Sequence, residues 1–529
     1  MFAERDEELR LSDGTRLVSR IWSPQGAGPW PALLMRQPYG RSIASTVTLA
    51  HPRWWADQGF VVVVQDVRGQ GDSEGVFRGF SQEAHDTAET HAWVRALPEC
   101  NGRIGCYGFS YQGLTQLLAP PGSPPPDCMA PAMAGLDERL HWSSEGGAHW
   151  WHLGLGWGLQ LAAQQARRRG DHGGWCEIRH SLENGDYLRT GPDLLRRHDP
   201  NGMAWTWLQL NPKNATGWHR HAVLDSWLKQ PMLLLGGWWD PHLMGLLDLD
   251  QRSRQAGGCP ELHVGPATHL QWWPEAQQLL LDFFNRHLKG DSITPRSVQR
   301  LWDLGNNSWC CPSLTSCGPW VLTGNALACH DLSNGQLEQG EAGAGSVAIV
   351  HDPWRPVPAQ GGHLSPTAGP MDRGSLDQRS DVATFTTRPL KGTQVIEGRP
   401  ELRITAAADQ PGFDLCVALS RLSAHSTAVE QLSTGVLRNL GEDARVQRQR
   451  VVRLQPLRAT LVEGDRLRLS IAAAAWPAIG VNPGTPDHPA GAPGPEHRVV
   501  TMTLNLAGSE LSLIPLNSGR LLQDPDSEP

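Results

Sequence analysis

The hydrophobic and polar positions in the first third of the chain alternate between strand-like and helix-like segments. Residues 60–69, FVVVVQDVRG, carry an unbroken β-branched run, which is typical of a strand buried on both faces of a parallel sheet. Residues 16–24, 30–40 and 102–110 also have strand-like patterns, and residues 83–97 have the pattern of a helix. Strands and helices in this order, joined by short links, predict a doubly wound α/β sheet.

The pattern changes between residues 141 and 227. Trp, His, Gln and Arg are spread through helix-like segments there, and no β run appears, so we expect an inserted helical region. Strand-like runs return at residues 231–240 and 260–269. Residues 274–290 then form an amphipathic helix that Gly290 ends.

After about residue 295 the helical pattern fades, and short strands alternate with turns rich in Gly and Pro. This is typical of an all-β sandwich, and we interpret it as a jelly roll. The strand-like runs are residues 297–305, 382–390, 400–408, 413–422, 465–474 and 497–506. The predicted organisation is an α/β core (1–140 and 228–294), a helical cap (141–227) and a β-sandwich (295–529).

Composition narrows the classes of partner and compartment. A net charge of −8 gives no reason to expect a nucleic-acid partner. No apolar run is long enough to cross a bilayer, and the charged N-terminus is unlike a secretory signal, so we expect a cytoplasmic protein without a membrane partner. Ten cysteines in such a chain are expected as free thiols. The spacing of Cys310, Cys311, Cys317, Cys329 and His330 matches no zinc motif, and no metal is predicted.

Ser110 is the candidate nucleophile. It follows a strand-like run, precedes a helix-like one and lies between Gly108 and Gly113. A sharp strand–turn–helix needs small residues on both sides of the serine, and Gly113 can meet that need only if Gln112 points away from the strand. The alternative is a serine that simply caps an ordinary helix.

Two downstream residues complete a candidate triad. Asp240 and His269 each follow a predicted strand, at the edge where open α/β sheets hold their sites. Their order after Ser110 is that of α/β-hydrolases. In this arrangement His269 accepts the Ser110 proton, and Asp240 fixes the tautomer of the imidazole.

The sequence resembles a family of serine hydrolases that includes cocaine esterase, X-Pro dipeptidyl-peptidases, α-amino-acid ester hydrolases and glutaryl acylases. The resemblance covers nearly the whole chain. In particular, GFSYQG resembles the family's nucleophile segment, in which the second glycine also comes late. The other matching segments are RQPYG, VVVVQDVRGQGDSEGVF, GGWWD, GPATH, GFDLCVALS and DRLRLSIAAAAWPAIGVNPGT.

The resemblance implies roles for further residues. Ser110, Asp240 and His269 would form the triad, with no cofactor. Tyr39, through its hydroxyl, and Tyr111, through its backbone N–H, would form the oxyanion hole. Trp157 would contact the acyl group, with core packing as the alternative role. We expect Asp66, Arg68 and Asp86 only to brace the loop above the sheet.

The predicted function is hydrolysis of a carboxylic ester, amide or short peptide through an acyl-enzyme, with a small molecule as the partner. Pro241, His242 and Leu243 follow Asp240 without a carboxylate, which disfavours an α-amino substrate. Glu145 is the one candidate for binding the N-terminus of a peptide. The alternatives are an X-Pro dipeptidyl-peptidase, an acyltransferase and an inactive carbohydrate-binding protein. The oligomeric state is left open, with a homodimer considered.

Overall fold

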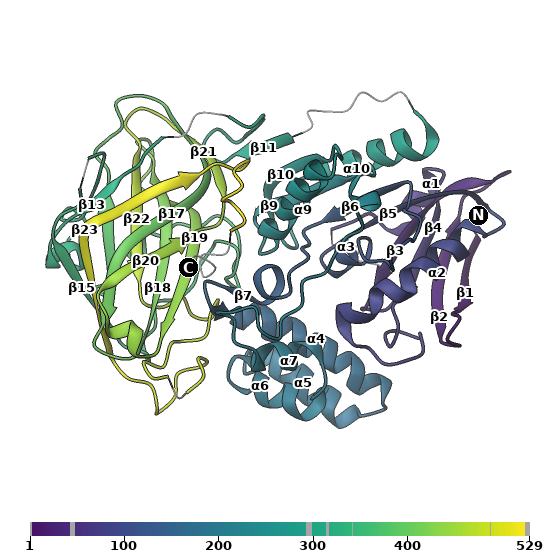
Figure 1. The fold of residues 1–529 in the computed structure, drawn as a ribbon, viewed down its shortest axis with the longest axis horizontal. Coiled ribbons are helices and arrows are strands. Elements are labelled where there is room, and N and C mark those ends of the chain that lie inside the picture. The colour runs from purple at the N-terminus through teal and green to yellow at the C-terminus, as the bar shows by residue number, and fades with distance from the viewer. Residues whose placement is uncertain are drawn as a thin grey trace.

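The fold is described from a computed structural model, which covers residues 3–42, 48–291, 299–313, 317–340, 342–486 and 488–523. The α/β core, the helices beneath it and the green to yellow C-terminal domain are distinct in Figure 1.

The core is an open sheet with the strand order β1-β2-β4-β3-β5-β6-β9-β10-β11-β12. Neighbouring strands from β4 to β11 are parallel, and β1, β2 and β12 add antiparallel edges. The strands are β1 (Ala3–Arg10), β2 (Arg16–Ser23), β3 (Trp30–Gln37), β4 (Val61–Asp66), β5 (Cys100–Phe109), β6 (Cys128–Ala132), β9 (Leu233–Trp239), β10 (Glu261–Thr268), β11 (Gln299–Asp303) and β12 (Ser308–Cys310).

Both faces of this sheet are buried, as the β-branched run predicted. Val61 and Val63 of β4 pack into one apolar cluster, and Val62 and Val64 pack into another on the opposite face. The first cluster includes residues of α2 (Glu83–Arg95), α3 (Tyr111–Thr115), α8 (Asp225–Leu228) and α9 (Leu243–Gln255). The second includes residues of α1 (Pro52–Asp57), α10 (Ala276–Phe284) and η3 (Asn285–Lys289). The doubly wound α/β architecture is therefore confirmed.

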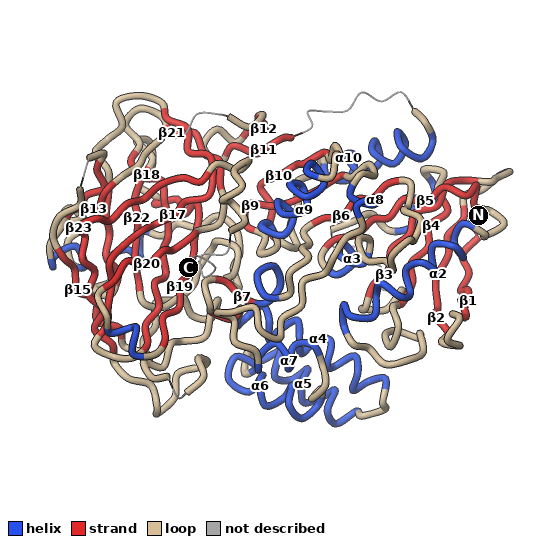
Figure 2. Tube along the Cα trace, viewed as in Figure 1, coloured by secondary structure: helices blue, strands red, loops and turns tan. Residues whose placement is uncertain are grey.

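A helical bundle occupies most of residues 141–227, below the core in Figure 2. Its helices share a small core that includes Leu155, Leu159, Ile178, Leu194 and Ala204. They are α4 (Trp151–Arg168), α5 (His172–Asn184), α6 (Tyr187–His198) and α7 (Met203–Gln209). A turn and a short hairpin lead into them: η2 (Arg139–Ser143), β7 (Ser144–Glu145) and β8 (Ala148–His149).

The C-terminal part is a β-sandwich of the jelly-roll type, as predicted. One sheet has the order β13-β14-β16-β22-β18-β19, and the other has β15-β23-β17-β20 with β21 paired to β17. The strands are β13 (Val321–Thr323), β14 (Gln336–Glu338), β15 (Ser346–His351), β16 (Val382–Thr386), β17 (Gln394–Ala408), β18 (Gly412–Leu422), β19 (Val429–Leu440), β20 (Arg448–Arg453), β21 (Leu457–Leu461), β22 (Arg466–Ala472) and β23 (Val500–Ile514). Short helical turns are η1 (Gly79–Gln82) in the core and η4 (Ala326–Cys329), α11 (Gly374–Asp377) and η5 (Glu442–Arg445) in the sandwich.

One strand assigned to the sandwich from its sequence lies elsewhere. Residues 299–303 form β11, which pairs in parallel with β10 and so extends the α/β sheet. The side chain of Asp303 at its end accepts hydrogen bonds from Thr460 of β21, one of them from the backbone N–H at 2.8 Å. This strand therefore joins the two parts of the molecule. The expected boundary at residue 294 lies outside the described residues.

No helix among the described residues is long and apolar enough to cross a membrane.

Candidate active site

The turn at Ser110 has the geometry of a strained strand–turn–helix. Ser110 follows β5 and precedes α3 with φ 59° and ψ −128°, and a positive φ is costly for any residue other than glycine. Its N–H donates to the carbonyl oxygens of Ala132 (3.0 Å) and Met133 (3.2 Å) at the end of β6. Within the described chain its side chain makes no capping bond to α3, so the helix-cap alternative fails.

Gly113, the second glycine of the turn, lies where there is no room for a side chain. A Cβ at Gly113 would lie 2.8 Å from the Ala132 carbonyl oxygen, so this position must be small where α3 crosses β6. A Cβ at Gly108 would lie 2.5 Å from the Cβ of Gln112. The Gln112 amide contacts the ends of two strands: its Nε2 donates to Gln37 Oε1 of β3 at 3.3 Å, and its Oε1 accepts from the Phe109 N–H of β5 at 3.4 Å. Both positions must therefore be glycine, but the expected orientation of Gln112 was wrong: its side chain faces the end of β5, and the turn has room for it because Gly108 has no side chain.

Tyr111 anchors α3 beneath the serine. Its hydroxyl donates to Glu83 Oε1 at 2.7 Å, and Glu83 forms a buried ion pair with Arg36 at 3.0 Å. Burial raises the pKa of both Glu83 and Tyr111. The backbone N–H of Tyr111 is the first of α3, and N–H groups of a first helical turn have no partner within their helix. This N–H is thus available to an oxyanion.

Asp240 and His269 meet at the carboxyl ends of β9 and β10. Asp240 is fully buried, and its Oδ1 accepts a hydrogen bond from His269 Nδ1 at 2.7 Å. Its Oδ2 accepts from the N–H of His242 at 3.2 Å. A carboxylate can only accept here, so His269 carries its proton on Nδ1 and presents Nε2 as a base.

Tyr39 follows β3 and faces the serine. Its hydroxyl and the Ser110 side chain line the same cavity, and the Trp157 indole N–H donates to this hydroxyl at 3.1 Å. Burial raises the pKa of Tyr39 to about 12, so the hydroxyl keeps its proton at neutral pH. Since the indole can only donate, the Tyr39 proton is left for another acceptor.

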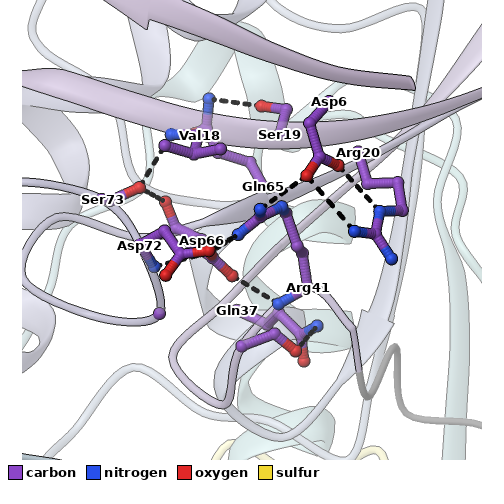
Figure 3. Close-up of polar contacts among 12 residues, drawn as sticks. Asp6, Val18, Ser19, Arg20, Gln37, Arg41, Gln65, Asp66, Asp72 and Ser73 are labelled. Carbon is purple, nitrogen blue, oxygen red and sulfur yellow. Dashed lines mark hydrogen bonds and ion pairs between the residues drawn. The ribbon is translucent and has the colours of Figure 1, made fainter. Parts of the chain in front are cut away.

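The loop after Tyr39 is held by the carboxylate of Asp66 (Figure 3). Asp66 accepts bonds from the Arg41 backbone N–H, the Arg41 guanidinium and the Asp72 N–H, the last two at 2.7 and 3.0 Å. Arg41 also pairs with Asp6 at 2.7 Å. Nearby, Arg68 pairs with Asp86 at 2.7 Å. These contacts agree with a bracing role for Asp66, Arg68 and Asp86.

A cavity of about 480 Å³ brings the predicted residues together. Tyr39, Ser110, Trp157 and His269 all line it, while Asp240 lies buried behind His269. No Asp or Glu lines this cavity among the described residues. The remaining lining residues are Phe109, Gln112, Trp142, Trp150, His152, Leu153, Gly154, Gly156, Gln160, His242 and Leu270.

Three side chains here are close enough to share a metal ion: Asp240, His242 and His269, whose ligand atoms lie within 4.8 Å of one another. Each is already engaged, because Asp240 binds His269 and the Nδ1 of His242 donates to the His141 carbonyl oxygen at 2.6 Å. The arrangement is a hydrogen-bonded network that leaves Nε2 of His269 unprotonated.

Glu145 lies outside the cavity. Its carboxylate pairs with His363 at 2.6 Å and accepts from the Val436 N–H at 3.2 Å, both in the C-terminal domain. It therefore fixes the β7–β8 hairpin to that domain. The sequence offered no means of detecting these contacts, because they join segments about 200 to 300 residues apart.

All ten cysteines are in the thiol form, without a disulfide among the described residues. In the candidate cluster, Cys310, Cys317 and Cys329 donate to the carbonyl oxygens of three separate residues, Leu301, Val395 and Ala348. Each of these three thiols therefore bonds a different strand: β11, β17 and β15.

Comparison with known proteins gives consistent matches to both halves of the chain. The model of the X-Pro dipeptidyl-peptidases of the S15 family matches residues 13–271. The model of the X-Pro dipeptidyl-peptidase C-terminal non-catalytic domain matches residues 307–505. Cocaine esterase from Rhodococcus sp. is 27% identical over 478 residues, covering 81% of each chain.

Solved structures share the whole fold. An aminopeptidase from a marine sediment Thaumarchaeota archaeon has a TM-score of 0.72 at 19% identity, covering 97% of this chain and 96% of its own. A CocE/NonD family hydrolase from Staphylococcus aureus has a TM-score of 0.70 at 16% identity, covering 96% and 93%. At these identities the likeness concerns the fold.

Proposed function

The chain belongs to the serine hydrolase family that contains the X-Pro dipeptidyl-peptidases of the S15 family and cocaine esterase, and we propose that it cleaves neutral carboxylic esters through an acyl-enzyme on Ser110. The observation that carries the proposal is the cavity that unites Ser110, His269 and Tyr39 with tryptophan walls and, among the described residues, without a carboxylate.

In the proposed first step, His269 Nε2 removes the Ser110 proton as Oγ attacks the ester carbonyl. Asp240 supports this step because its 2.7 Å bond to Nδ1 stabilises the imidazolium that forms. The imidazolium then protonates the leaving alcohol, and water releases the acyl group by the same steps in reverse order.

The negative charge of the tetrahedral intermediate needs two donors. The Tyr39 hydroxyl and the Tyr111 N–H support this role, since both lie next to Ser110 and neither is tied up as a donor elsewhere in the described chain. Losing one such donor commonly lowers kcat by about 100- to 1,000-fold.

The cavity favours an ester over the N-terminus of a peptide. A peptide ammonium that enters an apolar pocket needs a carboxylate to offset its lost hydration. Glu145, the candidate for that role, is bound to His363 and Val436 instead. Trp142, Trp150 and Trp157 provide apolar surface for an aromatic or other bulky acyl group.

The test is a substrate panel with matched serine variants. Benzoyl and phenylacetyl nitrophenyl esters are compared with X-Pro nitroanilides, using wild type, Ser110→Ala and Ser123→Ala, which alters a surface-loop serine. We expect ester turnover and fluorophosphonate labelling in wild type and Ser123→Ala, and at least a 1,000-fold loss in Ser110→Ala. Labelling that survives in Ser110→Ala would contradict the nucleophile assignment. Turnover of X-Pro nitroanilides alone would favour the dipeptidyl-peptidase.

A further inference from the structure

His242 forms a buried polar part of the cavity wall. It lies two residues after Asp240 and is 5% exposed. Its ring centroid is 4.4 Å from that of Trp142, 5.7 Å from that of Trp150 and 4.9 Å from that of His269. The ring is thus held between two tryptophans and beside the proposed base.

The protonation of this ring follows from its partners. Nδ1 faces the His141 carbonyl oxygen at 2.6 Å, and a carbonyl can only accept, so Nδ1 carries the proton. Burial lowers the pKa of His242 to about 4, which keeps the ring neutral. A neutral ring protonated on Nδ1 has an unshared pair on Nε2. Among the described residues, Nε2 has no hydrogen-bond partner.

His242 lies against two buried tryptophans of the cavity wall. Trp142 and Trp150 are each 3% exposed, whereas Leu270, beside His269, is 56% exposed and marks the opening. A leaving alcohol departs towards this opening after His269 protonates it. The acyl group, bonded to Ser110, is left in the cavity whose wall includes His242.

We infer that His242 Nε2 is an acceptor subsite for the acyl group and selects esters with a hydroxyl on the carbon next to the scissile carbonyl. The inference rests on the proposed ester hydrolysis and names its substrate class. The ring centroids of His242 and His269 are 4.9 Å apart, and both residues line the cavity with Ser110, so a hydroxyl on the carbon next to the scissile carbonyl would lie near the His242 ring.

A hydroxyl suits this subsite better than an ammonium. A neutral histidine offers a lone pair and no charge, and no carboxylate among the described lining residues would balance a cation. An ester without a donor would leave the buried nitrogen unsatisfied when its acyl group displaces water, and that costs affinity.

The test uses methyl mandelate, methyl phenylacetate and methyl phenylglycinate, which differ only in a hydroxyl, a hydrogen or an amine on that carbon. Acid release gives kcat/KM for wild type, His242→Phe, His242→Gln and Leu153→Ala, the last changing an apolar lining residue. For each protein, the kcat/KM for methyl mandelate and for methyl phenylglycinate is divided by the kcat/KM for methyl phenylacetate. These two quotients are the mandelate ratio and the phenylglycinate ratio, and in them a general loss of activity cancels. Fluorophosphonate labelling verifies that each variant has a working serine.

We expect the mandelate ratio to fall about tenfold in His242→Phe, with part of the ratio kept in His242→Gln, whose amide oxygen can accept. The ratio in Leu153→Ala should stay near that of wild type. An unchanged ratio in His242→Phe, or an equal fall in Leu153→Ala, would overturn the subsite. A preference for phenylglycinate that His242→Phe removes would overturn the choice of a neutral donor. Failure of the proposed function would appear separately, as unlabelled wild type or an active Ser110→Ala.

Discussion

The cap and the C-terminal domain both reach the candidate active site, but they contact different residues of it. The cap helix α4 contacts the oxyanion side, where Trp157 donates to the Tyr39 hydroxyl at 3.1 Å. The C-terminal domain contacts the acid side, where Gln455 Nε2 donates to the Asp240 carbonyl oxygen at 2.7 Å. The cap therefore contacts Tyr39, the proposed donor to the reacting oxygen. The C-terminal domain contacts Asp240, which supports the proposed base His269.

The two regions are also joined to each other. The N–H groups of Trp151 and His152, at the start of α4, donate to the carbonyl oxygens of Ala478 and Pro477 at 2.8 and 2.9 Å. The C-terminal domain thus helps to place the cap helix that carries Trp157. The matching family model describes this domain as non-catalytic. Its residues nevertheless contact both Asp240 and the helix that carries Trp157.

Replacing Gln455 should have the larger effect. Among the described residues, the buried Asp240 carbonyl in Gln455→Leu keeps only its 3.2 Å bond from the Leu243 N–H, and leaving a buried acceptor short of a partner costs about 1–3 kcal/mol. We expect kcat to fall about five- to tenfold with little change in KM, together with a lower Tm. Rates are measured well below Tm and normalised to the labelled fraction.

The matched control for Gln455 is Gln449→Leu. Gln449 lies exposed on β20 of the same domain and should change neither kcat nor Tm appreciably. If Gln455→Leu lowers Tm but leaves the normalised kcat intact, the contact stabilises the fold without positioning Asp240.

Replacing Trp157 should have a smaller effect on kcat. Trp157→Phe keeps an aromatic ring in the wall but removes the indole N–H that orients the Tyr39 hydroxyl, and we expect kcat to fall about three- to fivefold. Trp207→Phe is the control, because the N–H of that neighbouring indole bonds Glu138 instead. Equal losses of kcat in the two variants would mean that packing, and not the bond to Tyr39, is what matters.

The pH profile should show the smallest effect. A tyrosine donates its hydroxyl proton only while it is protonated, and burial raises the pKa of Tyr39 from 10.0 to about 12. We therefore expect no loss of kcat/KM from Tyr39 between pH 8 and pH 10. A fall centred near pH 10 that disappears in Tyr39→Phe would show that the hydroxyl is not desolvated beside the cap.

Elements with strong periodic patterns were predictable from the sequence. The run at residues 61–64 defined β4, because only a strand buried on both faces can be β-branched throughout. Strand β1 was missed, since Ala3–Arg10 is almost entirely charged. It forms the sheet edge by antiparallel pairing with β2, and cross-strand ion pairs such as Asp6 with Arg20 at 2.8 Å accompany that pairing.

The site was predictable only as far as local motifs extend. The turn at Ser110, the pair Asp240 and His269, and Tyr39 each lie in a short recognisable segment. From the sequence, His242 shows only that no carboxylate follows Asp240 closely. Its proposed role could not be predicted, because it depends on which groups face its two ring nitrogens. Gln455 had no signal, since its partner is 215 residues away and is a backbone atom.

Strand β11 has a consequence for protein engineering. It completes the α/β sheet beside β10, and Asp303 at its end is bonded to Thr460 of the sandwich. A truncation or domain exchange that cuts the chain before residue 299 would remove a strand of the sheet and expose the edge of β10. The unit to be moved or replaced therefore begins after β12, and a transplanted sandwich would need its own partner for Asp303 and a glutamine aimed at Asp240.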